Sequence, residues 1–487
     1  MKQFKIITIL LFSLLISVSC DKGFEDLNID PNNPVTVPSD LLIPGVVRSA
    51  QNESYSTFVG GDMGACWSQQ FAKVQYNDEA RYIPRQGVIT SLWDRFYAGT
   101  DLSQVNTGVI SDANSMYNLA VAEGNNNMMG VALTLQAYGF AFLTDVYGDI
   151  PFSEAIKANE GNIAPAYDKQ EDVYTGILAM LDDAIAKLGT SGTIDPTNDI
   201  LYSGDASLWK KFASSLKFRV LMRESGQVDV SGALQALVNA GNLFQSNADE
   251  AKLIYLSADP SANPLYESIV FGTRGEWKVN SEIVDRLTAD NDPRLPVYAA
   301  LNDAGIYRGK PSGFRDVPSD TYNYTNVSAL GDFYLRPELP GYFISNAQLK
   351  FLMAEAAQHN WINLDAGTLF KEAITASLDF NEVPAADASA FLATQNLESN
   401  NANALKQIAT QEWIALYSQG VESWNEWRRT GYPVLAPAAE AAFNQIPSRY
   451  NYPTTEYSIN KANVEAAVAT QGTDDLKTPI WWMGGNQ

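Results

Sequence analysis

Histidine and cysteine are almost absent from this chain of 487 residues, which contains one histidine and two cysteines. Histidine-rich zinc sites and Cys–His nucleophiles need several such side chains together, so the sequence excludes both. His359 lies near the expected C-terminus of a helix, where the helix dipole favours an imidazole, and we interpret it as structural. The sequence also lacks a G-x-S-x-G motif, a G-K-[ST] phosphate loop and a D-x-[DN]-x-[DN]-G calcium loop, so we expect no metal and no cofactor.

Basic residues are scarce as well. Lysine and arginine number 33 against 56 aspartates and glutamates, which gives a formal net charge of −23. Binding to nucleic acid or to an anionic membrane surface requires clustered basic side chains, so this composition disfavours both kinds of partner. A neutral ligand suits the charge balance better.

The N-terminus contains a short apolar run after basic residues. The segment "IITILLFSLLISV" follows the basic "MKQFK", is too short to span a bilayer, and leads to a serine and Cys20. This ending resembles the bacterial lipobox, although Ser17 replaces the usual aliphatic residue. We predict a lipoprotein signal peptide at residues 1–19, a lipidated Cys20 and a tether over residues 20–40, with simple secretion or a mitochondrial presequence as alternatives. Lipidation would leave Cys66 without a disulfide partner, and we interpret Cys66 as a small packed residue.

Helical periodicity dominates the rest of the chain. Residues 128–147 are apolar nearly all round, as in a helix at the centre of a domain, and residues 204–225 begin with an aspartate cap. Similar apolar spacing of three or four positions occurs at 88–112, 168–188, 345–358, 366–380, 403–418 and 459–470. The predicted fold class is mostly α, with helix pairs forming a scaffold, and with long loops and a few short strands elsewhere.

The middle of the chain, residues 255–343, has a different composition. It is rich in proline, glycine, tyrosine and asparagine, and it contains candidate strands such as "GIYRG" and "GDFYL". Long loops in compact proteins usually carry function. We therefore predict a loop-rich insertion here that contributes to a binding surface.

A series of motifs, in order along the chain, resembles one known family. The motifs are "FEDLNIDPNNP", "LWDRFYAGTDLSQVN", "YGFAFLTDVYGDIPFSEA", "LWKKFASSLKFRVLMR", "DNDPRLPVY", "FLMAEAA", "QEWIALYSQGVESWNEWRRTGYP" and "IPSRYNYPTTEYSIN". Together they resemble the SusD/RagB outer-membrane lipoproteins of Bacteroidetes-type bacteria. The closing "WWMGGNQ" departs from that family, because it lacks an acidic residue after the tryptophans. The resemblance covers essentially the whole chain, and we predict a single SusD-like domain at residues 41–487.

The resemblance implies a specific fold and function. The fold would contain four tetratricopeptide-like helix pairs with ligand-binding loops on one side. The protein would be non-catalytic, lipid-anchored in the outer membrane and facing the cell exterior, and it would deliver oligosaccharides or peptides to a TonB-dependent transporter. In starch-binding relatives the aromatic ligand surface draws on the segment equivalent to residues 67–86, which points here to Tyr76, Asp78, Arg81 and Tyr82.

A second loop has the side chains that sugars require. A sugar ring stacks its C–H groups on a flat aromatic face and needs fixed donors and acceptors for its hydroxyls. Residues 266–277 contain Arg274 and Trp277, and a glycine two positions before each of them frees the backbone. We add both residues to the predicted ligand-binding site. The alternative for every aromatic residue in the two loops is that it covers the core.

Two other functions compete with transport. A helical glycoside hydrolase needs only two suitably spaced carboxylates, and Asp145 and Asp149 are the most suggestive pair. A glycine precedes Asp149 and a proline follows two positions later, so we interpret Asp149 as part of a turn. The other competitor is a helix-pair scaffold that binds a protein or a peptide.

The stretch "GVESWNEWRRTGYP", residues 420–433, combines aromatic and charged residues that resemble a sugar platform when seen alone. It follows directly on a helix and coincides with a motif of the family. We therefore predict a helix junction in which Arg428 and Arg429 bind Glu422, Glu426 or nearby carbonyls.

Overall fold

The computed structural model describes residues 37–99, 108–315 and 321–485. The predicted signal peptide, Cys20 and most of the predicted tether lie outside these described residues. The described chain begins with a short 3-10 helix, Ser39–Leu42, whose Ser39 hydroxyl donates to Glu123 at 2.6 Å. The last residues of the predicted tether therefore already belong to the folded domain.

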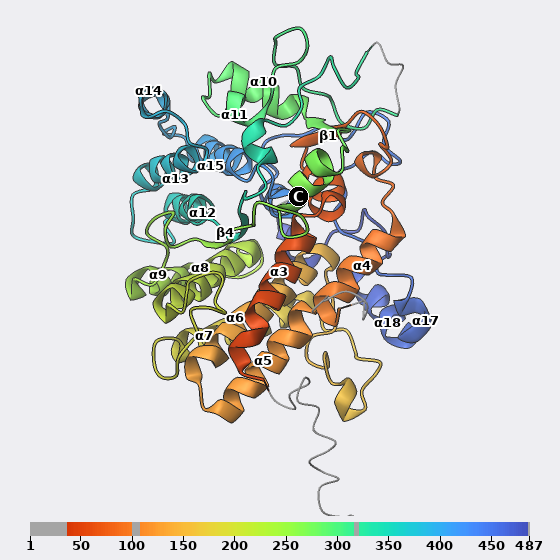
Figure 1. The fold of residues 1–487 in the computed structure, drawn as a ribbon, viewed down its shortest axis with the longest axis vertical. Coiled ribbons are helices and arrows are strands. Elements are labelled where there is room, and N and C mark those ends of the chain that lie inside the picture. The colour runs from red at the N-terminus through yellow and green to blue at the C-terminus, as the bar shows by residue number, and fades with distance from the viewer. Residues whose placement is uncertain (1–36, 100–107, 316–320, 486–487) are drawn as a thin grey trace, which may run out of the picture.

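Helix pairs form the scaffold, as the sequence predicts. The principal helices are α5 (Val109–Glu123), α6 (Asn126–Tyr147), α7 (Gln170–Lys187), α8 (Ala206–Glu224), α12 (Asn346–Gln358), α13 (Ala366–Phe380), α15 (Asn401–Ala415) and α16 (Gly420–Thr430). These helices form two groups, α5 to α8 and α12 to α16, and within each group neighbours along the chain pack against each other. Helix α8 of the first group contacts α12 of the second. Figure 1 shows the two groups stacked along one side of the molecule. The predicted mostly α fold with helix pairs is confirmed.

Shorter elements complete the fold. The remaining α-helices among the described residues are α3 (Ile43–Ser54), α4 (Gln86–Tyr97), α9 (Ser231–Ala240), α10 (Ser281–Ala289), α11 (Leu295–Tyr298), α14 (Ala385–Thr394), α17 (Glu456–Ile459) and α18 (Lys461–Gln471). The strands β1 (Phe71–Lys73) and β3 (Trp277–Val279) pair antiparallel, and so do β2 (Ala251–Leu253) and β4 (Gly341–Ile344). Within the described residues, the named strands therefore form two separate antiparallel pairs and no larger sheet.

Helix α6 lies at the centre because its sequence is apolar on every side. The Asn125 side chain caps its start by accepting the Met128 backbone N–H at 3.1 Å, and Gly148, at φ 88°, ends it. All of its residues from Asn127 to Tyr147 are buried. Among the described residues it is also the one helix long and apolar enough to cross a membrane, and here it is enclosed by the protein itself.

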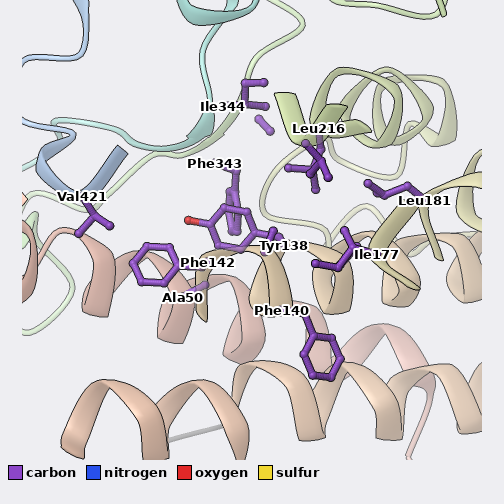
Figure 2. Close-up of a cluster of buried hydrophobic side chains, with 14 of the residues drawn as sticks. Ala50, Tyr138, Phe140, Phe142, Ile177, Leu181, Leu216, Phe343, Ile344 and Val421 are labelled. Carbon is purple, nitrogen blue, oxygen red and sulfur yellow. The ribbon is translucent and has the colours of Figure 1, made fainter. Parts of the chain in front are cut away.

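The main core forms where several elements meet α6. In Figure 2, Ala50 of α3, Ile177 of α7, Leu216 of α8 and Val421 of α16 surround the aromatic residues of α6. The ring of Tyr138 packs edge-on against Phe343 of β4, with centroids 4.7 Å apart. Large apolar surfaces buried between helices are the main source of stability in such a fold.

The middle region is more ordered than the sequence indicates. Residues 255–343 contain α10, α11, β3 and part of β4. The two candidate strands there are wrong: "GIYRG" is irregular, and "GDFYL" contains a 3-10 helix, Asp332–Leu335. This 3-10 turn buries the ring of Tyr334 against Tyr417, with ring centroids 4.7 Å apart. A strand would instead place successive side chains on alternate faces.

One predicted helix is divided. Residues 88–112 comprise the end of α4, which stops at Tyr97, and the start of α5 at Val109. A Cβ at Gly108 would overlap the Ala98 backbone, so the chain returns close upon itself at this point. Apolar spacing continues across the break because both helices face the same core.

Candidate functional site

Strand pairing brings the two predicted ligand loops together. Lys73 of β1 lies opposite Trp277 of β3, so the loop that follows β1 and the loop that precedes β3 lie side by side. Two π-helical turns, Thr57–Ala65 and Tyr266–Phe271, flank this region. π-Helical turns are rare and are often found at functional sites.

The two loops border an open hollow of about 620 Å³, within the range of small-molecule sites. Its lining residues are Lys73, Tyr76, Asp78, Glu79, Ile83, Pro84, Arg85 and Arg274. Three of the six predicted ligand residues, Tyr76, Asp78 and Arg274, are among them. The other three lie outside the lining.

Tyr76 is the exposed aromatic residue of the hollow. Its backbone has φ 56°, an uncommon conformation for a tyrosine, and 57% of its surface is exposed. The guanidinium carbon of Arg274 lies 5.7 Å from the centroid of this ring and 5.4 Å from that of Trp277. Glu276 accepts a hydrogen bond from Arg274 Nε at 2.8 Å, so the guanidinium is held between the two rings.

Trp277 and Tyr82 have a different position from the predicted one. Their exposed fractions are 1% and 2%, so neither ring presents a face to a ligand. The Trp277 indole N–H donates to Asp62 at 2.8 Å, and the Tyr82 hydroxyl accepts the Ala438 backbone N–H at 2.8 Å. Both rings cover the core, which was the alternative for the aromatic residues of these loops.

Arg81 and Asp78 fix the loop beside the hollow. Arg81 Nε donates to the Glu440 carbonyl at 2.8 Å, and its Nη1 lies 3.3 Å from Asp78 Oδ1. The Asp78 side chain remains 70% exposed. Arg81 therefore anchors the loop to a distant segment, whereas Asp78 presents a carboxylate at the hollow.

Four charged residues that the sequence did not reveal form a network that we call the floor. Lys73, Glu79 and Arg85 line the hollow, and Asp62 lies behind them. Asp62 is fully buried, and its carboxylate lies 2.9 Å from Lys73 Nζ and 2.7 Å from Arg85 Nη2. Glu79 also pairs with Arg85 and lies 4.0 Å from Lys73 Nζ. The one sequence signal is that an aspartate stands alone in the small, apolar "FVGGDMGAC".

Burial sets the electrostatics of this floor. Burial raises the pKa of Asp62 to about 6, while the neighbouring Lys73 ammonium opposes that rise. Each cation of the hollow has a carboxylate partner: Lys73 and Arg85 have Asp62 and Glu79, and Arg274 has Glu276. The hollow therefore offers oriented N–H donors and carboxylate acceptors around an aromatic face without a large excess of charge. This combination suits a neutral, hydroxyl-rich ligand.

The carboxylates considered for hydrolysis are occupied. Asp145 is buried, accepts from the Tyr174 hydroxyl and lies 3.2 Å from Arg223 Nε. Asp149 accepts the Gln170 backbone N–H at 2.9 Å, which agrees with its interpretation as a turn residue. Because both are buried, they present no open pair of carboxyl groups to a substrate.

His359 has a structural position. It is the C-terminal cap residue of α12, and its imidazole stacks on Trp361 with centroids 4.3 Å apart. Cys66 is buried, and burial raises the pKa of its thiol. Within the ranges that the structure describes, no group of three or more His, Cys, Asp and Glu side chains is arranged to hold a metal ion.

The stretch at residues 420–433 forms the predicted helix junction. The Trp424 indole is buried and donates to the Pro447 carbonyl at 2.9 Å. Arg428 stacks on Trp424, with its guanidinium carbon 3.6 Å from the ring centroid, and donates to the Ser448 carbonyl at 2.7 Å. Arg429 bridges Glu426 and Glu355. Trp424, Arg428 and Arg429 therefore hold helices together, and the buried Trp424 ring offers no face to a ligand.

Comparisons with known proteins agree with this fold. A family model described as SusD-like, "Starch-binding associating with outer membrane", matches residues 31–453. A search of the curated proteins finds no match.

Solved structures with the same fold cover nearly the whole chain. A chitin-binding protein is 24% identical with a TM-score of 0.78, and the match covers 92% of this chain and 99% of that protein. A chitin-binding SusD homologue from Flavobacterium johnsoniae is 22% identical with a TM-score of 0.79, over 91% and 98% of the two chains. A SusD homologue from Bacteroides fragilis is 24% identical with a TM-score of 0.78, over 92% and 100%. At these identities the likeness establishes the fold.

Proposed function

This chain belongs to the SusD-like family of starch-binding proteins that associate with the outer membrane, and we propose that it captures oligosaccharides in the hollow beside Tyr76. The exposed Tyr76 ring, held by Arg274 at the edge of a hollow of about 620 Å³, carries this proposal. A ring fixed in this way offers a stacking face at little cost in conformational entropy. The half-exposed Arg85 and the exposed Asp78 offer hydrogen bonds to hydroxyl groups.

We propose binding without catalysis, and the same residues support this part of the proposal. Asp78 is the exposed carboxylate of the lining, whereas Glu79 is buried and paired with Arg85. Glycoside hydrolysis needs one carboxyl group with a raised pKa and a second one across the glycosidic bond. The lining residues of the hollow lack that arrangement, so we propose that the bound oligosaccharide is released without being cleaved.

The cellular part of the proposal depends on the N-terminal residues, which lie outside the described ranges. Residues 1–19 would be a signal peptide, Cys20 would carry lipid, and a single domain would occupy residues 41–487 on the outside of the outer membrane. The bound oligosaccharide would then pass to a TonB-dependent transporter. The family's association with the outer membrane supports this arrangement.

A binding panel tests the proposal. Starch fragments, chitin oligosaccharides and short peptides are titrated separately into the purified protein by calorimetry, and the mixtures are analysed for products by chromatography. We expect an oligosaccharide to bind and to be recovered intact. Binding of peptides alone would support the peptide-binding alternative, and cleavage of a glycan would support the hydrolase.

The anchor has its own test. Cells that express the full chain or Cys20→Ser are labelled with a radioactive fatty acid and separated into membrane and soluble fractions. We expect label and membrane association only with Cys20 present, because acyl chains anchor through their buried methylenes. Equal membrane association of both proteins would contradict lipid anchoring.

A further inference from the structure

Asp62 has three partners on three different elements. Its carboxylate receives the Trp277 indole N–H of β3 at 2.8 Å, the Arg85 guanidinium at 2.7 Å and the Lys73 ammonium of β1 at 2.9 Å. The residue itself lies in the π-helical turn Thr57–Ala65 and is fully buried. Both carboxylate oxygens are therefore engaged, and neither faces the solvent.

Each partner leads to the lining of the hollow. Lys73 and Arg85 line it directly. Trp277 reaches it indirectly, because Arg274 stacks on Trp277 and Tyr76 in turn stacks on Arg274. One buried carboxylate thus connects the cationic side of the hollow with its aromatic side.

The half-exposed Arg85 is held by this carboxylate together with that of Glu79. Its side chain is 49% exposed and lies over the Phe58 ring, with the guanidinium carbon 4.4 Å from the centroid. A long side chain in this position loses considerable rotamer freedom when it is fixed. The charge-assisted bonds to Asp62 and Glu79 offset that loss and hold the guanidinium in one orientation.

We propose that Asp62 is a positioning residue for the ligand-binding hollow, which orients Arg85 directly and supports the Trp277–Arg274–Tyr76 stack without touching the ligand. This inference rests on the proposed function for the identity of the hollow. Binding sites need a shell of supporting residues that locks the groups in contact with the ligand.

Burying such a group is costly, which indicates a role beyond packing. Burial alone disfavours the ionised carboxylate, and Glu79 adds a like charge nearby. Apolar residues in place of both Asp62 and the buried Lys73 would fill the same space without this cost. The carboxylate is useful because it fixes two cations at the edge of the hollow.

The test compares Asp62→Asn with a matched control, Asp199→Asn. Asp199 is also buried and also accepts an indole N–H, from Trp209 at 2.8 Å, but it lies outside the hollow. The first measurement is the affinity for the starch fragment or chitin oligosaccharide that binds the wild type most tightly. The second is the rate at which phenylglyoxal modifies Arg85 in the ligand-free protein, followed by peptide mass spectrometry.

For Asp62→Asn we expect an affinity about tenfold weaker, the effect of losing one charge-assisted bond, and a several-fold faster modification of Arg85. Asp199→Asn should change neither quantity. Asp62→Asn combined with Arg85→Ala should bind little more weakly than Arg85→Ala alone, since both changes remove the same oriented group. Wild-type affinity together with a wild-type Arg85 rate in Asp62→Asn would overturn the proposal.

Two further outcomes remain informative. If no starch or chitin probe binds the wild type, the proposed function fails, and the Arg85 modification rate alone decides whether Asp62 positions this side chain. If Asp62→Asn does not fold, the same measurements are made on Asp62→Asn/Lys73→Met, which removes one buried charge of each sign. An unchanged Arg85 rate in that variant would equally overturn the proposal.

Discussion

The guanidinium carbon of Arg274 lies 5.7 Å from the centroid of the Tyr76 ring, at the open edge of the hollow. This contact fixes an aromatic ring that is otherwise largely surrounded by solvent. It also joins two loops that are about 200 residues apart in the sequence. The loops are neighbours because Lys73 of β1 pairs with Trp277 of β3.

Removing the Arg274 guanidinium should loosen Tyr76. We expect Arg274→Ala to weaken oligosaccharide affinity about fivefold, the size of an exposed cation–π contact, and Arg274→Lys to have a smaller effect. Arg315→Ala is the control, because Arg315 is an exposed arginine outside the lining of the hollow. Calorimetric titration measures all three, and equal affinities for Arg274→Ala and Arg315→Ala would contradict the stacking role.

Gly420 should tolerate no side chain. A Cβ there would overlap the Gly60 carbonyl oxygen and the Ala65 backbone nitrogen, where α16 meets the π-helical turn that carries Asp62. We expect Gly420→Ala to lower the free energy of unfolding by about 1–3 kcal/mol, as overpacking does.

Gly232 in α9 provides the comparison for that glycine. A Cβ at Gly232 has no atom within 4 Å, so Gly232→Ala should raise the free energy of unfolding by about 0.5–1 kcal/mol through better helix propensity. Urea unfolding measures both variants. The close backbone approach would be refuted by Gly420→Ala being as stable as Gly232→Ala.

The buried pair between Arg429 and Glu355 should be far more important for stability than an exposed pair. Arg429 Nη2 lies 2.5 Å from Glu355, and its Nε lies 2.7 Å from Glu426. Arg429→Leu leaves two buried carboxylates without this cation, and we expect a loss of about 3–5 kcal/mol in unfolding free energy. The exposed pair Arg336–Glu382 gives the control, where Arg336→Leu should cost about 0–1 kcal/mol. Similar losses in the two variants would contradict this ranking.

Much of the fold could be predicted from sequence, because helices are local. Apolar spacing located α6 and α7 nearly to the residue, and Asp205 caps α8 by accepting the Ser207 backbone N–H at 2.8 Å. Spacing failed at the break between α4 and α5, where both helices use the same apolar period. It also failed at "GDFYL", because a run of aromatic residues fits a strand and a buried 3-10 turn equally well.

The site was only partly predictable, for a different reason. The family resemblance and the loop composition pointed to the two segments that border the hollow, but the exposure of an aromatic ring depends on contacts with distant residues. Tyr76 and Tyr82 belong to one loop, and only the second ring packs into the core. Asp62 was missed because its partners, Lys73, Arg85 and Trp277, become neighbours only when β1 pairs with β3.

Glu224 should make stability depend on pH. Burial alone raises the pKa of this carboxyl, near the end of α8, to about 7. A carboxyl with a higher pKa in the folded state stabilises the protein below the unfolded pKa, near 4.5, and this contribution is lost as pH rises through about 7. Glu224→Gln should therefore unfold at higher urea concentrations than the wild type at pH 8, with a smaller difference at pH 4. A difference that does not change with pH would contradict the raised pKa.

The most direct test of the central claim is the oligosaccharide affinity of Tyr76→Ala compared with Tyr432→Ala. Tyr432 is a suitable control, because its ring also lies beside a cation but lines a different hollow. The Lys406 ammonium is 5.4 Å from the centroid of this ring, and the hollow has a volume of about 570 Å³. Truncating an aromatic anchor typically costs over 1 kcal/mol, so we expect Tyr76→Ala to bind at least about fivefold more weakly by calorimetry. Tyr432→Ala should bind like the wild type. Unchanged affinity in Tyr76→Ala, or an equal loss in Tyr432→Ala, would show that the ligand does not bind beside Tyr76.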